Sequence, residues 1–103
     1  MDGIKFDSKK EAEYYQKLKI LLKQGVIKDL ELQKEYLLQD KFVINGKTIR
    51  AIKYRADFVY YDTRDKQEHI VDIKGSKRTM TTDFKIKKKL FAYKYGKEIE
   101  VVI

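Results

Sequence analysis

The chain contains no cysteine and no proline, and only one histidine, His69, in 103 residues. The absence of cysteine excludes a disulfide framework and any thiolate metal site. A single imidazole excludes histidine-rich zinc chemistry and any catalytic triad that needs more than one histidine. No apolar run is long enough to span a membrane, and the amino terminus lacks the apolar core of a signal peptide. The sequence therefore predicts a cytoplasmic protein without membrane contacts.

The composition is typical of one folded domain spanning residues 1–103. Hydrophobic residues make up 43% of the chain and aromatic residues 13%, which is enough to build a core despite 39% charged residues. The net charge of +8 is localised: residues 74–97 hold nine basic residues and one acid, Asp83, so this segment alone accounts for the excess. A localised positive field suits a polyanion such as nucleic acid. A solvated, lysine-rich helix face explains the same charge, and position alone does not separate the two interpretations.

The order of the predicted elements indicates an α/β fold. Two helices are predicted, at about 8–24 and 81–95, each followed by a glycine. The first begins with a capping box formed by Ser8 and Glu11, and its buried arc comprises Tyr14, Tyr15, Leu18, Leu21 and Leu22. Strands are predicted at 30–38, at 42–44 with the stretch from 48 across an Asn-Gly turn, and at 52–61, 68–74 and 99–103. The prediction is a single domain with a central mixed sheet flanked by two helices.

The second predicted helix has two apolar stripes, where a surface helix of a monomer needs one. One stripe contains Phe84, Phe91 and Tyr95, and the nearly opposite one contains Ile86, Leu90 and Tyr93. One stripe is expected to pack on the sheet. The other would contact either the first helix or a loop, or else a partner subunit, and both alternatives stay open at this stage.

The triplet Asp72-Ile73-Lys74 is the main candidate for chemistry. Residues two apart on a strand point to the same face, so Asp72 and Lys74 would project side by side while Ile73 anchors the strand in the core. Other Asp-x-Lys triplets occur at 7–9 and 83–85, but only this one ends an apolar strand, and it is followed by Gly75. Carboxylates can hold Mg²⁺, and a nearby lysine can position water or neutralise charge on a phosphate.

Two further carboxylates are candidates for the same site. Asp57 lies in an otherwise apolar strand predicted to pair with the strand of Asp72, and burying its charge is costly unless a cation or partner compensates it. A structural salt bridge to Arg55 or Lys74 is the alternative. Glu11 completes the capping box, but its helical angle places it on the buried face, from which it could reach a metal directly or through water. His69 falls on the opposite strand face from Asp72 and is left outside the site.

These residues resemble the PD-(D/E)xK nuclease superfamily, whose core order is helix, three strands, helix, strand (α-β-β-β-α-β, restriction-endonuclease-like). The resemblance covers nearly the whole chain, with Asp57 at the first motif carboxylate and Asp72-Ile73-Lys74 at the (D/E)xK triplet. Glu11 falls where archaeal-type Holliday junction resolvases carry a helix-one glutamate. The chain is also similar to small phage-encoded proteins with the motifs FDSKKEAEYY, YRADFVYYD and VDIKG, which would place it in the host cell cytoplasm. Ala56 departs from the motif proline.

The resemblance implies a Mg²⁺-dependent endonuclease, with Mn²⁺ expected to substitute. The metal would be held by Asp57, Asp72, the backbone carbonyl of Ile73 and, directly or through water, Glu11, with Lys74 beside the attacking water. DNA phosphates would contact Lys77, Arg78, Lys85, Lys88 and Lys89. Because no element suggests base readout, a structure-selective enzyme acting on branched DNA, as in recombination, is favoured. Branched DNA needs two symmetric cuts, so such an enzyme is expected to be a homodimer. A nicking or restriction-type nuclease, or a basic DNA-binding module without catalysis, is the alternative; no small-molecule substrate is expected.

Overall fold

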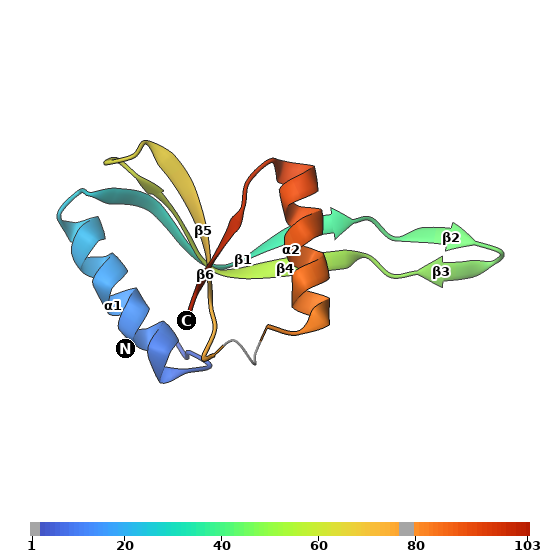
Figure 1. The fold of residues 1–103 in the computed structure, drawn as a ribbon, viewed down its shortest axis with the longest axis horizontal. Coiled ribbons are helices and arrows are strands. Elements are labelled where there is room, and N and C mark those ends of the chain that lie inside the picture. The colour runs from blue at the N-terminus through green and yellow to red at the C-terminus, as the bar shows by residue number, and fades with distance from the viewer. Residues whose placement is uncertain (1–2, 77–79) are drawn as a thin grey trace.

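The computed structural model describes residues 3–76 and 80–103, which form two helices and six strands (Figure 1). The elements follow the chain in the order α1 (Lys9–Lys23), β1 (Ile27–Gln39), β2 (Phe42–Ile44), β3 (Lys47–Ile49), β4 (Ile52–Asp62), β5 (Gln67–Ile73), α2 (Thr82–Tyr95) and β6 (Ile99–Val102). This order confirms the α/β fold class predicted from the sequence.

The central sheet is mixed and has the strand order β1-β4-β5-β6. The β1–β4 and β4–β5 pairs are antiparallel, whereas β5 and β6 are parallel. A parallel pair requires a crossover, and α2 supplies it. Figure 1 shows α1 and α2 well apart, each with the sheet beside it. The fold is therefore a sheet flanked by two helices, as predicted.

Two apolar clusters form the core, one on each face of the sheet. The cluster under α2 contains Leu38, Tyr54, Ala56, Val59, Ile70, Phe84, Phe91 and Ile99. The cluster under α1 contains Tyr15, Leu18, Ile27, Phe58, Tyr60, Val71 and Ile73. Neighbouring residues of β5 alternate between the two clusters, as the pleat requires. This alternation sends Ile73 into the core beneath α1 and leaves Asp72 facing the other way.

The Asn-Gly hairpin is a projecting arm, separate from the central sheet. Strands β2 and β3 pair only with each other, and Asn45 and Gly46 have positive φ values of 50° and 73°, which suits a tight hairpin turn. Figure 1 shows the hairpin extending away from the two helices, and the molecule measures 54 × 28 × 27 Å along its principal axes. The hairpin Phe42–Ile49 is called the arm below.

Two details of the first third of the chain differ from the sequence prediction. Strand β1 begins at Ile27, three residues before the predicted start, and Ile27 is fully buried. The register shifts between Lys28 and Glu31, and Asp29 has a φ of 56°, so a bulge interrupts the alternation that would have marked the strand. Leu22 was predicted to be buried, but it lies in the last turn of α1 and is 39% exposed.

Over the described parts of the chain, neither helix is long and apolar enough to cross a membrane.

Candidate active site

One pocket gathers all four residues predicted to be catalytic. It has a volume of about 340 Å³ and is lined by Asp7, Ser8, Glu11, Arg55, Asp57, Asp72, Ile73, Lys74 and Gly75. These residues come from the start of α1, the middle of β4 and the end of β5. Segments that are far apart in sequence thus bring four carboxylates, three of them from the predicted catalytic residues, and the cations Arg55 and Lys74 to one place.

Asp72 is buried and held from two sides. Its side chain lies next to that of Lys74, whose Nζ is 3.1 Å from Asp72 Oδ1, as the strand spacing predicts. The other oxygen, Oδ2, accepts a hydrogen bond of 2.7 Å from the Tyr54 hydroxyl. Lys74 Nζ also lies 4.0 Å from the centre of the Phe84 ring, so α2 supports the lysine from behind. The carboxylate orientation is therefore fixed by its neighbours.

At Asp57 the regular alternation of side chains along β4 is interrupted, so that the residues on either side of Asp57 point to opposite faces of the sheet. Ala56 packs in the cluster under α2 and Phe58 in the cluster under α1, although residues two apart on a strand normally share a face. On the neighbouring strand, Gln33 lies between the residues paired with Ala56 and Phe58 and has a φ of 55°. Asp57 Oδ2 accepts a 2.7 Å hydrogen bond from the backbone N–H of Ile73. Among the described residues it forms no ion pair with Arg55 or Lys74, so the predicted alternative of a structural salt bridge is not what the structure contains.

Glu11 combines the capping role and the pocket position. Ser8 Oγ accepts a hydrogen bond of 3.1 Å from the backbone N–H of Glu11, so Ser8 caps α1 as predicted. The Glu11 side chain accepts a 3.1 Å hydrogen bond at Oε2 from the backbone N–H of Asp7. The same side chain is only 5% exposed and lines the pocket beside Asp57. The two interpretations of this residue are therefore compatible.

The carboxylates of the pocket destabilise one another's charge. The pKa of Asp57 is raised to about 7, first by burial and then by the adjacent Glu11 carboxyl, against the opposing effects of the Ile73 N–H and Lys74. Burial also raises the pKa of Asp72, with a contribution from the Asp57 charge, against the hydrogen bond from Tyr54 and the charge of Lys74. Lys74 and Arg55 carry two positive charges against the four carboxylates that line the pocket, so the pocket favours an additional cation.

Two residues at the site were not anticipated as functional: Tyr54, which contacts Asp72 without lining the pocket, and Arg55, which lines it. Tyr54 is 4% exposed and holds Asp72, and the available signal was that a buried tyrosine hydroxyl usually has a partner. Arg55 was considered only as a salt-bridge partner, yet it is exposed and lines the pocket. Gly75 also lines it, and a Cβ added there would meet no atom within 4 Å, so packing within the described chain does not require this glycine.

The residues predicted to contact DNA are only partly placed by the structure. Lys85 and Lys89 are exposed on α2, and Lys88 is half-buried on the same helix. Lys77 and Arg78 lie outside the described residues. The backbone carbonyl of Ile73, predicted as a metal ligand, belongs to a residue that lines the pocket, and its part in metal binding stays a prediction.

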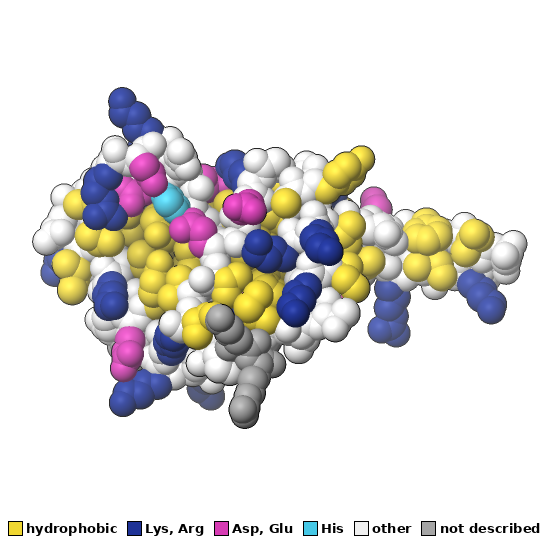
Figure 2. All heavy atoms as spheres, viewed as in Figure 1, with side chains coloured by type: hydrophobic (Ala, Val, Ile, Leu, Met, Phe, Trp, Pro, Cys, Tyr) yellow, Lys and Arg dark blue, Asp and Glu magenta, His cyan; other side chains and the backbone are white. Residues whose placement is uncertain are grey.

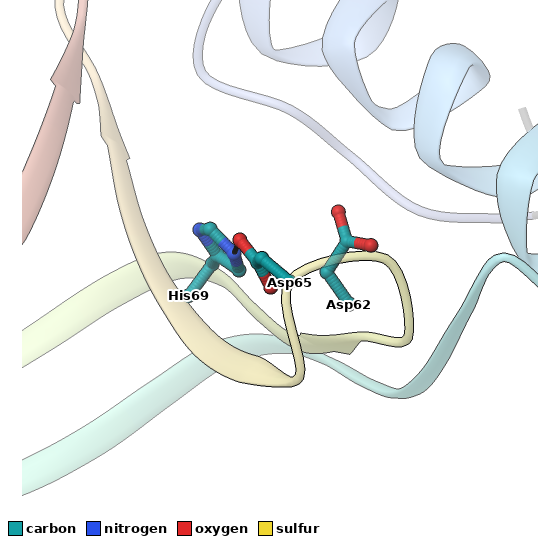
Figure 3. A group of neighbouring side chains, drawn as sticks. All are labelled: Asp62, Asp65 and His69. Atoms are coloured by element: carbon teal, nitrogen blue, oxygen red, sulfur yellow. Dashed lines mark hydrogen bonds and ion pairs between the residues drawn. The ribbon is translucent and has the colours of Figure 1, made fainter.

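A second acidic group lies at the β4–β5 turn and includes His69 (Figure 3). Ligand atoms of Asp62, Asp65 and His69 lie within 4.8 Å of one another. Each is already paired: the Arg64 guanidinium donates to both Asp62 oxygens, and His69 Nε2 lies 2.7 Å from Asp65 Oδ2. The hydrogen bonds from Arg64 hold the pKa of Asp62 down at about 2. This compensation makes the group a weaker candidate for a cation than the pocket.

A larger hollow also lies near this turn and offers less chemistry. Its volume is about 860 Å³, and its lining includes Glu68, Lys97, His69 and Glu100. Lys97 pairs with Glu68 at 3.0 Å, and His69 Nδ1 lies 2.6 Å from Glu100 Oε2. These four side chains are matched in pairs, whereas in the smaller pocket Lys74 pairs with Asp72 and leaves Asp57 and Glu11 without an ion pair among the described residues.

Comparison with known proteins identifies a family and no individual relative. No curated protein and no solved structure matches the chain. A family model described as "Protein of unknown function (DUF1064)" matches residues 1–102, and the chain therefore belongs to this family.

Proposed function

We propose that this protein is a Mg²⁺-dependent endonuclease that hydrolyses phosphodiester bonds in DNA. The observation that carries the proposal is the pocket that brings Glu11, Asp57 and Asp72 together around Lys74. A pocket that served only to bind phosphate would gain from cations alone, because carboxylates repel the phosphate backbone. Three carboxylates beside a lysine fit a site that recruits a metal ion before it recruits DNA.

The donor set fits a hard divalent cation. All the side-chain donors are carboxylate oxygens, which Mg²⁺ prefers, and Mn²⁺ accepts the same ligands. The raised pKa of Asp57 has burial and the Glu11 carboxyl as its main causes, and a cation between the two side chains would relieve the repulsion. Asp57, Asp72 and Glu11 would hold the ion, with the Ile73 carbonyl as a further ligand. When bound, the ion would supply an activated water and neutralise charge on the scissile phosphate.

The chain's own residues would position the reacting groups. Hydrolysis adds a water oxygen to phosphorus and breaks one phosphorus–oxygen ester bond. The Lys74 ammonium group, held between Asp72 Oδ1 and the Phe84 ring, would donate a hydrogen bond to the attacking water or to a phosphate oxygen. Tyr54 would keep Asp72 Oδ2 occupied, so that Oδ1 is the oxygen presented to the pocket. Arg55 would contact a neighbouring phosphate at the rim.

The proposed substrate is branched DNA, bound by a homodimer. The exposed cations on α2 suit contacts with phosphates, which position DNA without reading its sequence. The sequence contains no pattern typical of base readout in a groove. A structure-selective enzyme therefore fits better than a sequence-specific one. Resolving a four-way junction requires two symmetric cuts, and a twofold dimer would supply two equivalent sites.

Cleavage of a labelled four-way junction beside a linear duplex, with and without Mg²⁺, tests the proposal. We expect Mg²⁺-dependent cutting of the junction in preference to the duplex, and loss of cutting in Asp72→Asn. The matched control is Asp65→Asn, which removes a carboxylate from the second acidic group and should leave cleavage unchanged. Equal cutting of duplex and junction would favour a nicking or restriction-type nuclease over a junction resolvase. Tight DNA binding without cutting in Mg²⁺ or Mn²⁺ would leave a non-catalytic binding module.

A further inference from the structure

The arm has one apolar face that nothing in the described chain covers. In its ladder, Phe42 pairs with Ile49 and Ile44 with Lys47, so these four side chains share one face. Phe42, Ile44 and Ile49 are 44%, 52% and 36% exposed. The other face carries Val43 and Thr48. An isolated two-stranded hairpin is only marginally stable in water, and three adjacent large apolar side chains on it indicate a protein contact.

A second uncovered apolar surface lies on α2. Phe84 and Phe91 pack into the core, whereas Ile86 is 53% exposed and Tyr93 is 91% exposed on the outer side of the helix. Helix α1 cannot cover this stripe, because its buried residues belong to the cluster on the opposite face of the sheet. Leu90, the third member of the predicted second stripe, packs partly against the core under α2. Of the alternatives left open by the sequence, the first helix is therefore excluded, and the exposure of Ile86 and Tyr93 shows that no described loop covers them either.

We infer that the arm of one copy packs on the outer face of α2 of a second copy, in a twofold dimer. Figure 2 shows hydrophobic side chains on the arm and over the α2 region on the same face of the molecule. In a twofold arrangement, a contact between the arm of one copy and α2 of the other occurs twice. Each uncovered surface is then covered once in each copy.

The size of the two surfaces agrees with a second copy as the partner. The exposed fractions of Phe42, Ile44, Ile49, Ile86 and Tyr93 leave on the order of 500 Å² of apolar surface uncovered per chain. A stable protein interface buries roughly 800 Å² per partner, of which somewhat more than half is apolar. The arm and α2 together supply an apolar centre of that size, and the lysines beside them would form the rim.

The arrangement also suits the proposed function. The need for two copies rests on that function, because two symmetric cuts require two active sites. In Figure 1 the start of α1 lies at the lower edge of the molecule and the loop that follows β5 descends to the same edge, while the arm extends sideways. A twofold axis that passes between α2 and the arm and runs vertically in the plane of this view would keep both lower edges on the same side. The two active sites would then face one DNA molecule.

Mass measurement of the full chain in solution, without metal or DNA, tests the inference. We expect twice the chain mass of 12.3 kDa at micromolar concentration. Ile44→Lys and Tyr93→Lys should each raise the dimer dissociation constant by roughly a hundredfold, because each buries an unpaired charge. The matched control, Val43→Lys, places the same charge on the other face of the arm, at a side chain that is 68% exposed, and should leave the mass unchanged.

Disulfide cross-linking locates the contact, since the chain has no natural cysteine. A mixture of Ile44→Cys and Tyr93→Cys chains should form a mixed disulfide dimer on oxidation. A monomeric wild type, or a dimer unaffected by Ile44→Lys and Tyr93→Lys, would overturn the inference. A monomer whose DNA affinity falls in Ile44→Lys would also overturn it and assign the arm to DNA. Absence of cleavage in a dimeric wild type would count against the proposed function alone.

Discussion

Replacing Tyr54 by phenylalanine removes one hydrogen bond from the proposed site and leaves the ring in place. The hydroxyl donates to Asp72 Oδ2 over 2.7 Å, and both residues are about 5% exposed or less. The ring packs on Phe84 and Phe91 at centroid distances of 6.3 and 5.9 Å, and phenylalanine preserves these contacts. The variant therefore tests the hydrogen bond and not the packing.

The expected cost follows from the burial of a charged acceptor. A hydrogen bond to a charged group contributes about 1.5–3 kcal/mol, and a buried partner left without its donor loses this contribution. We expect Tyr54→Phe to lower the free energy of unfolding of the metal-free protein by about 2 kcal/mol, which lowers the Tm by roughly 10 °C in a domain of this size. If Asp72 holds the metal, loss of the residue that orients it should weaken Mg²⁺ or Mn²⁺ binding by roughly 10–100-fold.

The chain offers a matched control on the neighbouring strand. Tyr36 pairs with Tyr54 in the β1–β4 ladder and packs edge-on against Phe91, at a centroid distance of 4.9 Å. Its buried hydroxyl has no hydrogen-bond partner within the described chain. Tyr36→Phe should therefore be neutral or stabilising. Urea denaturation monitored by circular dichroism gives the stabilities, and calorimetric titration gives the metal affinities.

Equal stability of Tyr54→Phe and Tyr36→Phe would refute the assignment of this hydrogen bond. A loss of stability in Tyr54→Phe with unchanged metal affinity would reduce Tyr54 to a structural role. Only a loss of metal affinity in Tyr54→Phe, with wild-type affinity in Tyr36→Phe, supports the positioning role.

Three further predictions concern charge and packing. Because burial and Glu11 raise the pKa of Asp57 to about 7, the metal-free native state binds more protons than the unfolded chain, so stability should fall as the pH rises from about 4 through 7. Asp57→Asn should reduce this fall in urea denaturation series, and an undiminished fall would contradict the assignment. Burial lowers the pKa of His69, but hydrogen bonds to carboxylates on both ring nitrogens outweigh it and leave the pKa raised. Protonated His69 then contributes to the free energy of unfolding in full below its ordinary pKa near 6.5, and this contribution is lost as the pH rises through the raised pKa. His69→Gln should abolish that loss in the same urea denaturation series. Phe91 is 1% exposed, so Phe91→Ala should lower the free energy of unfolding by about 3–5 kcal/mol and weaken or abolish the cooperative thermal transition. A smaller decrease would show that the core under α2 collapses around the cavity.

Local chemistry made much of the fold and site predictable. The Ser8 capping box sets the start of α1, and Gly96, with a φ of 67°, ends α2. The two-residue spacing of Asp72 and Lys74 at the end of a strand predicts the ion pair observed between them. The short turn between β4 and β5 forces these strands to pair, which brings Asp57 near the end of β5.

The remaining features depend on contacts between distant segments. The Tyr54–Asp72 hydrogen bond requires the register of β4 against β5 and the burial of both residues, which no local pattern encodes. The change of face at Asp57 accompanies an unusual backbone conformation at Gln33 on another strand. The Asn-Gly turn predicts a hairpin, but whether that hairpin joins the sheet or projects from it depends on where β1 and β4 separate.

Single-turnover cleavage of a four-way DNA junction by wild type and Lys74→Met, in saturating Mg²⁺, tests the central claim most directly. Methionine keeps much of the apolar stem but removes the ammonium group that lies 3.1 Å from Asp72. The account predicts that the variant still binds the junction and cuts it at least about 100-fold more slowly. Cutting at the wild-type rate, or no cutting by either protein, would contradict the assignment of this pocket as a nuclease active site.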